Sequence, residues 1–244
     1  MRCFVCFATA VFLVICLASD SKDMVLPVPQ SEMAKFEART GGMIKQEPNG
    51  KAILVVDARG DTSMPLDQLV NVASVMIKLP FNLKTATIGD LPIYDTAKGF
   101  KGSSSPSVIL FVDKSGWPSL TVFPEDAIAV VNIDKLKTSD VSFYKKRIAR
   151  EFWRAVGFAC GGYAMGGKGD VMQPIFSVYE LDSMLGNQLN PMRFNGIFSA
   201  ALKLDLRLDR PVPYSAAVRQ GWAPQPTNEM QRAIWLKYKD RPIK

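Results

Sequence analysis

The pattern of apolar and polar positions along the chain predicts a mixture of strands and helices. Short apolar runs bounded by turn residues, as expected of buried strands, occur at 51–60, 107–116 and 120–136. Apolar residues recur at helical spacing at 31–40, 63–80, 139–158, 179–189 and 195–206, with a last helix after the capping pair Asn228 and Gln231. Residues 81–106 carry neither pattern and are predicted to be loop-rich. This order predicts an α/β (α+β) fold with a mixed β-sheet, packed helices and a helical C-terminal part.

The strongest helical pattern lies at 139–158, where Ser139 or Asp140 can cap the first turn. Its predicted buried face consists of Tyr144, Ile148, Phe152, Ala155 and Ala159. A neighbouring stripe carries Arg147, Arg150, Glu151 and Arg154. On this stripe Glu151 is expected to form an ion pair with Arg154 or Arg147, because side chains three or four residues apart meet on a helix.

The first 19 residues have the order of a secretory signal peptide, with Arg2 followed by an apolar run from Cys3 to Ala18 and then polar residues. Cleavage after Ala18 or Ser19 is expected. Lipidation at Cys16 is the alternative, although Ile15 stands where a small residue is normally required. The run is shorter than the roughly 20 apolar residues of a membrane anchor. We therefore predict an exported protein, whether periplasmic, envelope-associated or secreted, with no stable transmembrane segment after removal of the signal.

Composition and charge narrow the classes of function. The chain is basic, with 30 Lys and Arg against 23 Asp and Glu, and it contains no histidine. Its cations are scattered rather than clustered with aromatic residues, which argues against nucleic-acid binding. Beyond the predicted leader, which holds Cys3, Cys6 and Cys16, the chain keeps only Cys160. No internal disulfide is then possible, and a buried, inert thiol is expected because no histidine is available to act as its base.

One segment has the spacing of a zinc-peptidase motif. The sequence REFWRAVGFAC (150–160), continued by GGYAMGGKGDVMQP, follows HExxHxxGxxH and a methionine turn in its spacing. Glu151 stands at the general-base position, Gly157 at the glycine and Met172 in the methionine turn. The three positions of the zinc ligands hold Arg150, Arg154 and Cys160.

On these residues the chain resembles the metzincin zinc peptidases and is most similar to their archaemetzincin-like group, with a degenerate zinc motif. The motif spans residues 150–174, and the order of elements over about 50–175 agrees with that family. The resemblance implies a metzincin-like domain at 20–175 and a helical C-terminal extension at 176–244 packed on the same domain. It also implies that Glu151 is a vestigial general base.

The departures from the motif count against catalysis. Arginine is protonated at ordinary pH and has no lone pair for a metal, so Arg150 and Arg154 repel zinc rather than hold it. Cys160 alone does not make a metal site. We therefore expect no metal and no cofactor, and no catalytic residue.

A simpler interpretation treats the same residues as an amphipathic helix whose charged stripe faces solvent or a shallow cleft, with Met172 filling a gap in the core. A phosphate-binding loop at Gly162 to Lys168 is disfavoured, because Gly169 replaces the magnesium-binding Ser or Thr and the loop follows a helix.

The function predicted first is that of an exported pseudo-peptidase that binds an acidic peptide or an anionic glycan in the former cleft. Its expected site consists of Arg150, Glu151, Arg154, Cys160 and Met172. The alternatives are a structural or envelope-associated protein without a functional cleft, and a hydrolase with a site that does not use zinc.

Overall fold

The computed structural model describes residues 30–60, 64–160 and 170–240. The predicted signal peptide, with Cys3, Cys6 and Cys16, lies outside the described residues, and so does the glycine-rich stretch at 161–169.

Five strands of the described chain form one mixed sheet in the order β3-β2-β4-β6-β5. They are β2 (Ile53–Asp57), β3 (Phe81–Thr85), β4 (Ser107–Val112), β5 (Leu120–Phe123) and β6 (Ile128–Asn132). Strands β2, β3, β4 and β6 run parallel to one another. Strand β5 pairs antiparallel with β6 and forms one edge of the sheet. The prediction of a mixed sheet is confirmed, and Pro124 divides the predicted third strand into β5 and β6, with a short 3-10 turn at Pro124–Asp126 between them.

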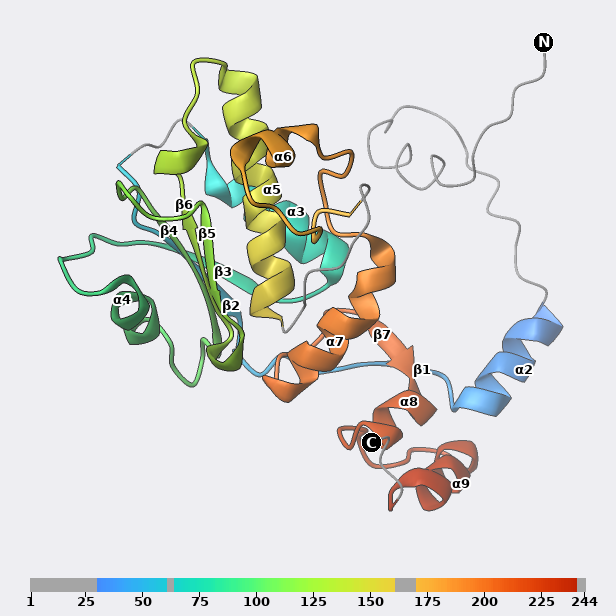
Figure 1. Cartoon of the computed structure of the whole chain (residues 1–244). Helices are drawn as coiled ribbons and strands as arrows, with labels where there is room; N and C mark the ends of the chain where they lie inside the picture. Colours follow the sequence, from blue (N-terminus) through green and yellow to red (C-terminus); the bar gives the residue numbers. More distant parts are fainter. Residues whose placement is uncertain (1–29, 61–63, 161–169, 241–244) are drawn as a thin grey trace, which may run out of the picture.

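Helices cover both faces of this sheet, as Figure 1 shows. Helices α3 (Leu66–Ile77) and α5 (Val141–Ala159) lie on one face, and α4 (Ile93–Gly99) lies on the other. Side chains alternate along each strand because successive residues point to opposite faces. In β4, Ile109 and Phe111 join the larger core beneath α3 and α5, whereas Val108 and Leu110 pack toward α4.

The prediction that residues 81–106 are loop-rich is wrong in two places, β3 and α4. Strand β3 lies at the sheet edge and its side chains are half-buried or exposed, so its sequence FNLKT lacks the apolar run of a buried strand. Helix α4 has only seven residues, of which Ile93 and Ala97 are buried, too few to show a helical period.

The C-terminal part is helical, as predicted, and contributes to two cores. Helices α6 (Val178–Ser183) and α7 (Phe194–Lys203) place residues such as Leu181 and Ile197 in the core shared with α5. A 3-10 turn at Pro191–Arg193 leads into α7, and another at Asp134–Leu136 precedes α5.

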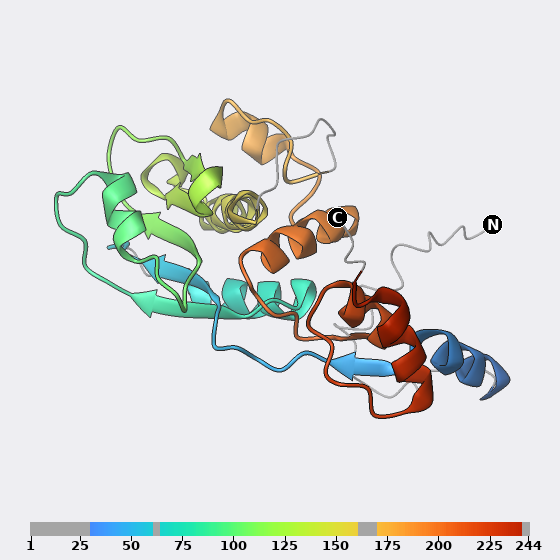
Figure 2. The same ribbon diagram turned by 90° about the horizontal axis from the view of Figure 1, so that it is seen from below.

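A smaller cluster joins the two ends of the described chain. Helix α2 (Gln30–Thr40) and strand β1 (Met43–Lys45) lie beside β7 (Pro211–Pro213), α8 (Tyr214–Arg219) and α9 (Glu229–Tyr238), as Figure 2 shows. Strands β1 and β7 pair antiparallel, and Tyr214, Val218 and Ile234 form the buried centre. The predicted cap of α9 is confirmed, because Asn228 Oδ1 accepts a hydrogen bond from the Gln231 backbone at 2.9 Å, while Gln231 Oε1 accepts from the Thr227 backbone.

None of the helices in the described ranges combines the length and the apolar character needed to cross a membrane.

Candidate functional site

The helix predicted to carry the site is α5. Asp140 caps it, accepting hydrogen bonds from the backbone N–H groups of Ser142 and Phe143. The predicted buried face is confirmed: Tyr144, Ile148, Phe152, Ala155 and Ala159 are all buried. The helix continues past Gly157 to Ala159. Three residues of the charged stripe, Arg150, Glu151 and Arg154, are buried as well, and Arg147 is half-buried, so the stripe does not face open solvent.

The side chain of Arg150 ends inside the segment that begins with α6. Nη1 donates to the carbonyl oxygens of Leu181 at 2.6 Å and Asp182 at 3.1 Å. Nη2 donates to the Met184 carbonyl at 2.8 Å, and Nη2 and Nε both donate to Asn187 Oδ1. These five bonds match the five N–H groups of a guanidinium, and the residue is only 6% exposed. Arg150 therefore has no donor left for a ligand, and it caps the C-terminal end of α6 as a cation.

The side chain of Arg154 bonds both to Glu151 and to the methionine turn. Its Nε donates to Glu151 Oε2 at 2.9 Å, which is the predicted ion pair. Its Nη1 donates to the carbonyl oxygens of Val171 at 3.1 Å and Gln173 at 2.6 Å. No described residue accepts a hydrogen bond from Nη2. Nη1 thus binds the turn around Met172, and Nε binds Glu151.

Glu151 is 1% exposed, and both of its carboxylate oxygens have partners. Oε2 accepts from Arg154, and Oε1 accepts from the Ser119 hydroxyl at 2.8 Å. Burial raises the pKa of Glu151, while Arg154 and Ser119 act in the opposite direction. A carboxylate held in this way is an internal counter-ion rather than a base that is free to activate water.

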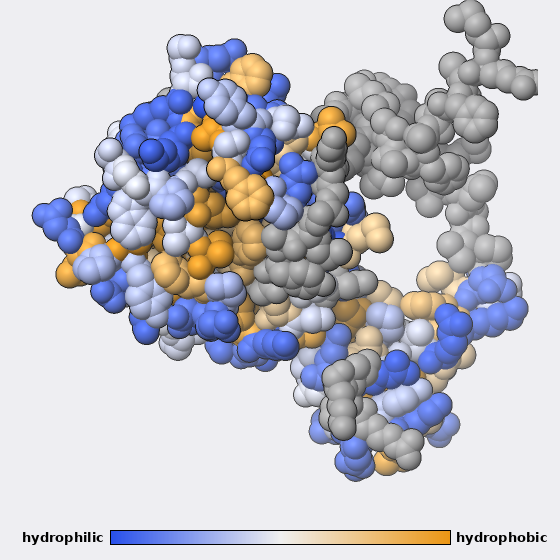
Figure 3. All heavy atoms as spheres, viewed as in Figure 1, coloured by the Kyte–Doolittle hydropathy of each residue, from blue (hydrophilic) through white to orange (hydrophobic). Residues whose placement is uncertain are grey.

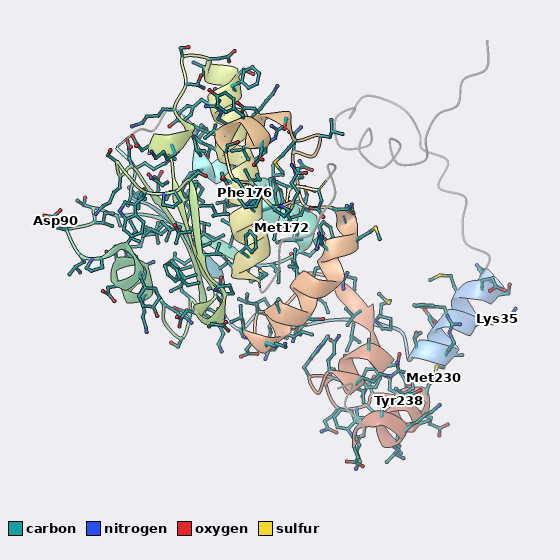
Figure 4. The ribbon with its side chains drawn as sticks, viewed as in Figure 1. Lys35, Asp90, Met172, Phe176, Met230 and Tyr238 are labelled. Carbon is teal, nitrogen blue, oxygen red and sulfur yellow. The ribbon has the colours of Figure 1, made fainter. Side chains whose placement is uncertain are left out.

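Met172 packs directly against Gly157. A Cβ added at Gly157 would overlap Met172 Sδ, so a larger residue there would force the Met172 side chain to move. Asp170 shapes the turn, because its Oδ1 accepts from the Met172 backbone at 2.9 Å and its Oδ2 binds Arg193 Nε at 2.7 Å. Met172 is labelled beside α5 in Figure 4. The predicted methionine turn is therefore present, with its sulfur in a close apolar contact.

Cys160 follows the last residue of α5 and is 1% exposed. Burial raises the pKa of its thiol to about 12. The prediction of a buried thiol is confirmed, and at neutral pH the sulfur is protonated.

These donors do not fit zinc. Two of the three ligand positions hold guanidinium groups that are already bonded to carbonyl oxygens, and the third holds a protonated thiol. Within residues 30–60, 64–160 and 170–240, no three His, Cys, Asp or Glu side chains lie close enough to hold a metal ion.

A pocket of about 420 Å³ opens beside this pair of charges. Glu151 and Arg154 lie in its lining, together with Ser119. Its apolar lining comes from the edge strand β5 and the loop before it, from the end of α5, and from the segment that leads into the first residue of α6, namely Trp117, Leu120, Val122, Phe158, Ile175, Phe176 and Val178. Figure 3 shows hydrophobic side chains exposed over the face between β5 and α6, and Figure 4 labels Phe176 there.

Two further ion pairs that sequence reasoning missed hold the same region together. Arg147 binds both carboxylate oxygens of Asp182 and lowers its pKa. Arg193 binds Asp170. Helical spacing predicts Arg147 only as a partner of Glu151, whereas its partner Asp182 lies 35 residues further along the chain. No local spacing signals a pair of this kind.

No protein-family model matches the sequence, and no curated protein matches it. Solved structures do match. Archaemetzincin from Methanopyrus kandleri superposes with a TM-score of 0.50 at 17% identity, covering 63% of this chain and 97% of that one. Archaemetzincin from Archaeoglobus fulgidus, solved with malonate, gives 0.45 at 13% identity, covering 59% and 98%. A zinc-dependent peptidase from Methanocorpusculum labreanum gives 0.44 at 14% identity, covering 60% and 100%.

At such low identity the likeness shows the fold alone. That likeness agrees with the element order and with the methionine turn beneath α5. The chain therefore has an archaemetzincin-like metallopeptidase fold with a degenerate zinc motif, in which Arg150, Arg154 and Cys160 stand where the ligands would be.

Proposed function

We propose that this protein is an exported, non-catalytic relative of the zinc peptidases that binds an extended peptide in the pocket beside β5. The observation that carries the proposal is the Glu151–Arg154 ion pair in the pocket lining, where no described residue accepts a hydrogen bond from Arg154 Nη2. The pair neutralises the former general base, and the remaining donor suits a peptide carbonyl or a carboxylate.

The walls of the pocket support an extended ligand. Strand β5 is the sheet edge, and no strand in the described part of the chain pairs with its outer side. Such an edge offers main-chain donors and acceptors to an added strand. Trp117, at 37% exposure, and Phe176, at 90%, supply apolar surface for the ligand's side chains.

The charge of the pocket favours a ligand with a carboxylate. Lys135 is exposed in the lining, while the charges of Glu151 and Arg154 compensate each other. The net cationic character supports an acidic residue or a free C-terminus on the peptide. Of the five residues predicted to form a binding site, we retain Arg154 as a direct donor. Arg150, Cys160 and Met172 are assigned to the support of the pocket, and Glu151 to the orientation of Arg154.

The alternative of a hydrolase without zinc rests on one contact, between Ser119 and Glu151. The geometry resembles a nucleophile with its base, but Glu151 is only 1% exposed and its second carboxylate oxygen is bonded to Arg154. Labelling of Ser119 by a fluorophosphonate reagent would favour this alternative over ours.

The test is a binding screen with a combinatorial library of short synthetic peptides, half with free C-terminal carboxylates and half with C-terminal amides. We expect saturable binding that prefers carboxylates, no cleavage of the peptides by mass spectrometry, and no stoichiometric zinc in the purified protein. Lys135→Glu should weaken binding of the selected peptides about tenfold.

Lys203→Glu is the matched control, because Lys203 is exposed on α7 and does not line the pocket. An equal loss of peptide affinity in both variants would mean that the effect comes from the net charge of the protein and not from the pocket. Stoichiometric zinc, or cleaved peptides, would contradict the non-catalytic part of the proposal.

A further inference from the structure

A second pocket lies away from the first, where the loop between β1 and β2 meets the start of β3 and the segment before β7. Its volume is about 410 Å³, and it shares no lining residue with the pocket beside β5. This size is at the small end of ligand pockets, suited to a single sugar or amino-acid residue.

Hydrogen bonds within the chain hold the walls of this pocket in place. Asp205 accepts from Asn49 Nδ2 through its carbonyl and from Lys51 Nζ through its carboxylate, both at 2.8 Å. The Asp209 backbone donates to the Lys78 carbonyl at 2.8 Å. The walls come from segments about 155 residues apart in sequence and are linked before any ligand arrives.

Two polar groups of the lining lack partners. Arg207 Nη1 donates to the Glu47 carbonyl at 3.0 Å, but Arg207 Nε is buried without a hydrogen-bond partner among the described residues. Gln46 is 8% exposed, and its amide forms no hydrogen bond with a described residue. Arg207 Nε is too deeply buried for a ligand to reach, whereas no described residue accepts a hydrogen bond from Arg207 Nη2. Nη2 and the Gln46 amide therefore remain available to a ligand with acceptor oxygens.

The charges of this pocket favour an anion. Lys45 forms an ion pair with Asp209, and Lys51 with Asp205, so these four charges compensate one another. Arg207 forms no ion pair with any described carboxylate, although it is near enough to help lower the pKa of Asp205. The guanidinium of Arg207 is therefore the uncompensated charge of the lining.

We propose that this second pocket binds a small carboxylate ligand, with Arg207 Nη2 donating to the carboxylate and the Gln46 amide contacting a neighbouring polar group. A guanidinium is suited to this role because its N–H groups match the geometry of carboxylate oxygens. The same carboxylate chemistry occurs in a sugar acid and in an acidic amino-acid residue. The two sources differ in the rest of the ligand, which Gln46 and Asn82 would contact from opposite segments of the lining.

The test uses two acids, each with a neutral counterpart: glucuronate against glucose, and N-acetylglutamate against N-acetylglutamine. Titrations of the full chain labelled with ¹⁵N follow the Nε–Hε signal of Arg207 and the side-chain amide signals of Gln46. We expect at least one acid to shift both signals saturably and its neutral counterpart to leave them unchanged. Whichever acid does so identifies the source of the carboxylate.

Two substitutions then test the assigned contacts. Arg207→Met should weaken binding of that acid about tenfold, which corresponds to about 1.4 kcal/mol. Gln46→Met removes the amide at similar volume and should also weaken it. Arg232→Met, on the exposed surface of α9, removes the same charge and should leave binding unchanged.

Three results would overturn the proposal: no saturable shift with either acid, equal shifts with acid and neutral compound, or an unchanged affinity in Arg207→Met. The amide spectrum of each variant is compared with that of the unchanged protein before titration, so that a misfolded variant is recognised. If Arg207→Met misfolds, the affinity of Gln46→Met for the acid tests the proposal instead.

Discussion

Replacing Arg154 by methionine gives the sharpest test of the idea that guanidinium groups organise the degenerate site. Methionine keeps an unbranched apolar stem and loses the charge. It also loses the bond to Glu151 and the two bonds to the carbonyl oxygens of Val171 and Gln173. Glu151, at 1% exposure, would keep only the Ser119 hydroxyl as a partner.

The magnitude follows from burial. Removing one partner of a buried ion pair typically costs about 3–5 kcal/mol, because the other charge is left uncompensated. This cost is a large fraction of the total free energy of unfolding of a protein, which is typically about 5–15 kcal/mol. Urea denaturation followed by circular dichroism should therefore show a clearly lower midpoint. Arg232→Met, at an exposed position, should change stability by less than about 0.5 kcal/mol.

A double substitution separates the ion pair from simple loss of packing. Glu151→Leu combined with Arg154→Met removes both charges, and apolar replacement of a buried pair is often nearly neutral. We expect the double variant to be more stable than Arg154→Met alone, with a residual loss from the carbonyl oxygens of Val171 and Gln173. The reasoning fails if Arg154→Met costs less than about 1 kcal/mol, or if adding Glu151→Leu destabilises the protein further.

Three other outcomes follow from the same region. Gly157→Ala should destabilise the protein by about 1–3 kcal/mol, since its Cβ would meet Met172 Sδ at 2.4 Å, and Met172→Ala in the same chain should recover part of the loss in thermal melts. Because the thiol pKa of Cys160 is raised from 9.0 to about 12, the unfolded chain loses this proton first as pH rises above 9.0. Stability should then fall by about 1.4 kcal/mol per pH unit in that window, and a Cys160→Ala variant that declines equally steeply would contradict this. Glu151→Gln should lower stability in urea titrations by leaving the Arg154 charge buried without its counter-ion, whereas a catalytic base would tolerate this change with little loss of stability.

The sequence predicted the elements whose signals are local. The period of Tyr144, Ile148 and Phe152, with Asp140 before them, was enough to identify α5 and its buried face. The spacing from Glu151 to Met172 led to the correct fold, because it reflects how a helix and a turn meet in space. Strand β3 was missed, since an exposed edge strand does not need an apolar run.

The burial of the arginines could not be predicted in the same way. The partners of Arg150 are chiefly main-chain carbonyl oxygens, which every residue possesses and which leave no trace in the sequence. Their position depends on how the segment after the methionine turn folds back over α5. The same holds for Arg147, whose ion pair joins residues 35 positions apart. Charged residues on a helix suggest a solvent-exposed face, but here the tertiary fold provides hydrogen-bond acceptors for the buried arginines.

The cluster formed by α2, β1, β7, α8 and α9 has a consequence for how the chain folds during synthesis. The Gln231 side-chain amide donates to the Gly41 carbonyl across 190 residues, and β1 pairs with β7 over a similar separation. The sheet and α5 can assemble as soon as residues up to about 190 have left the ribosome, but β1 must wait for nearly the whole chain. Until then, α2 and β1 remain without their partners, an interval in which a chaperone or a second nascent chain can bind them.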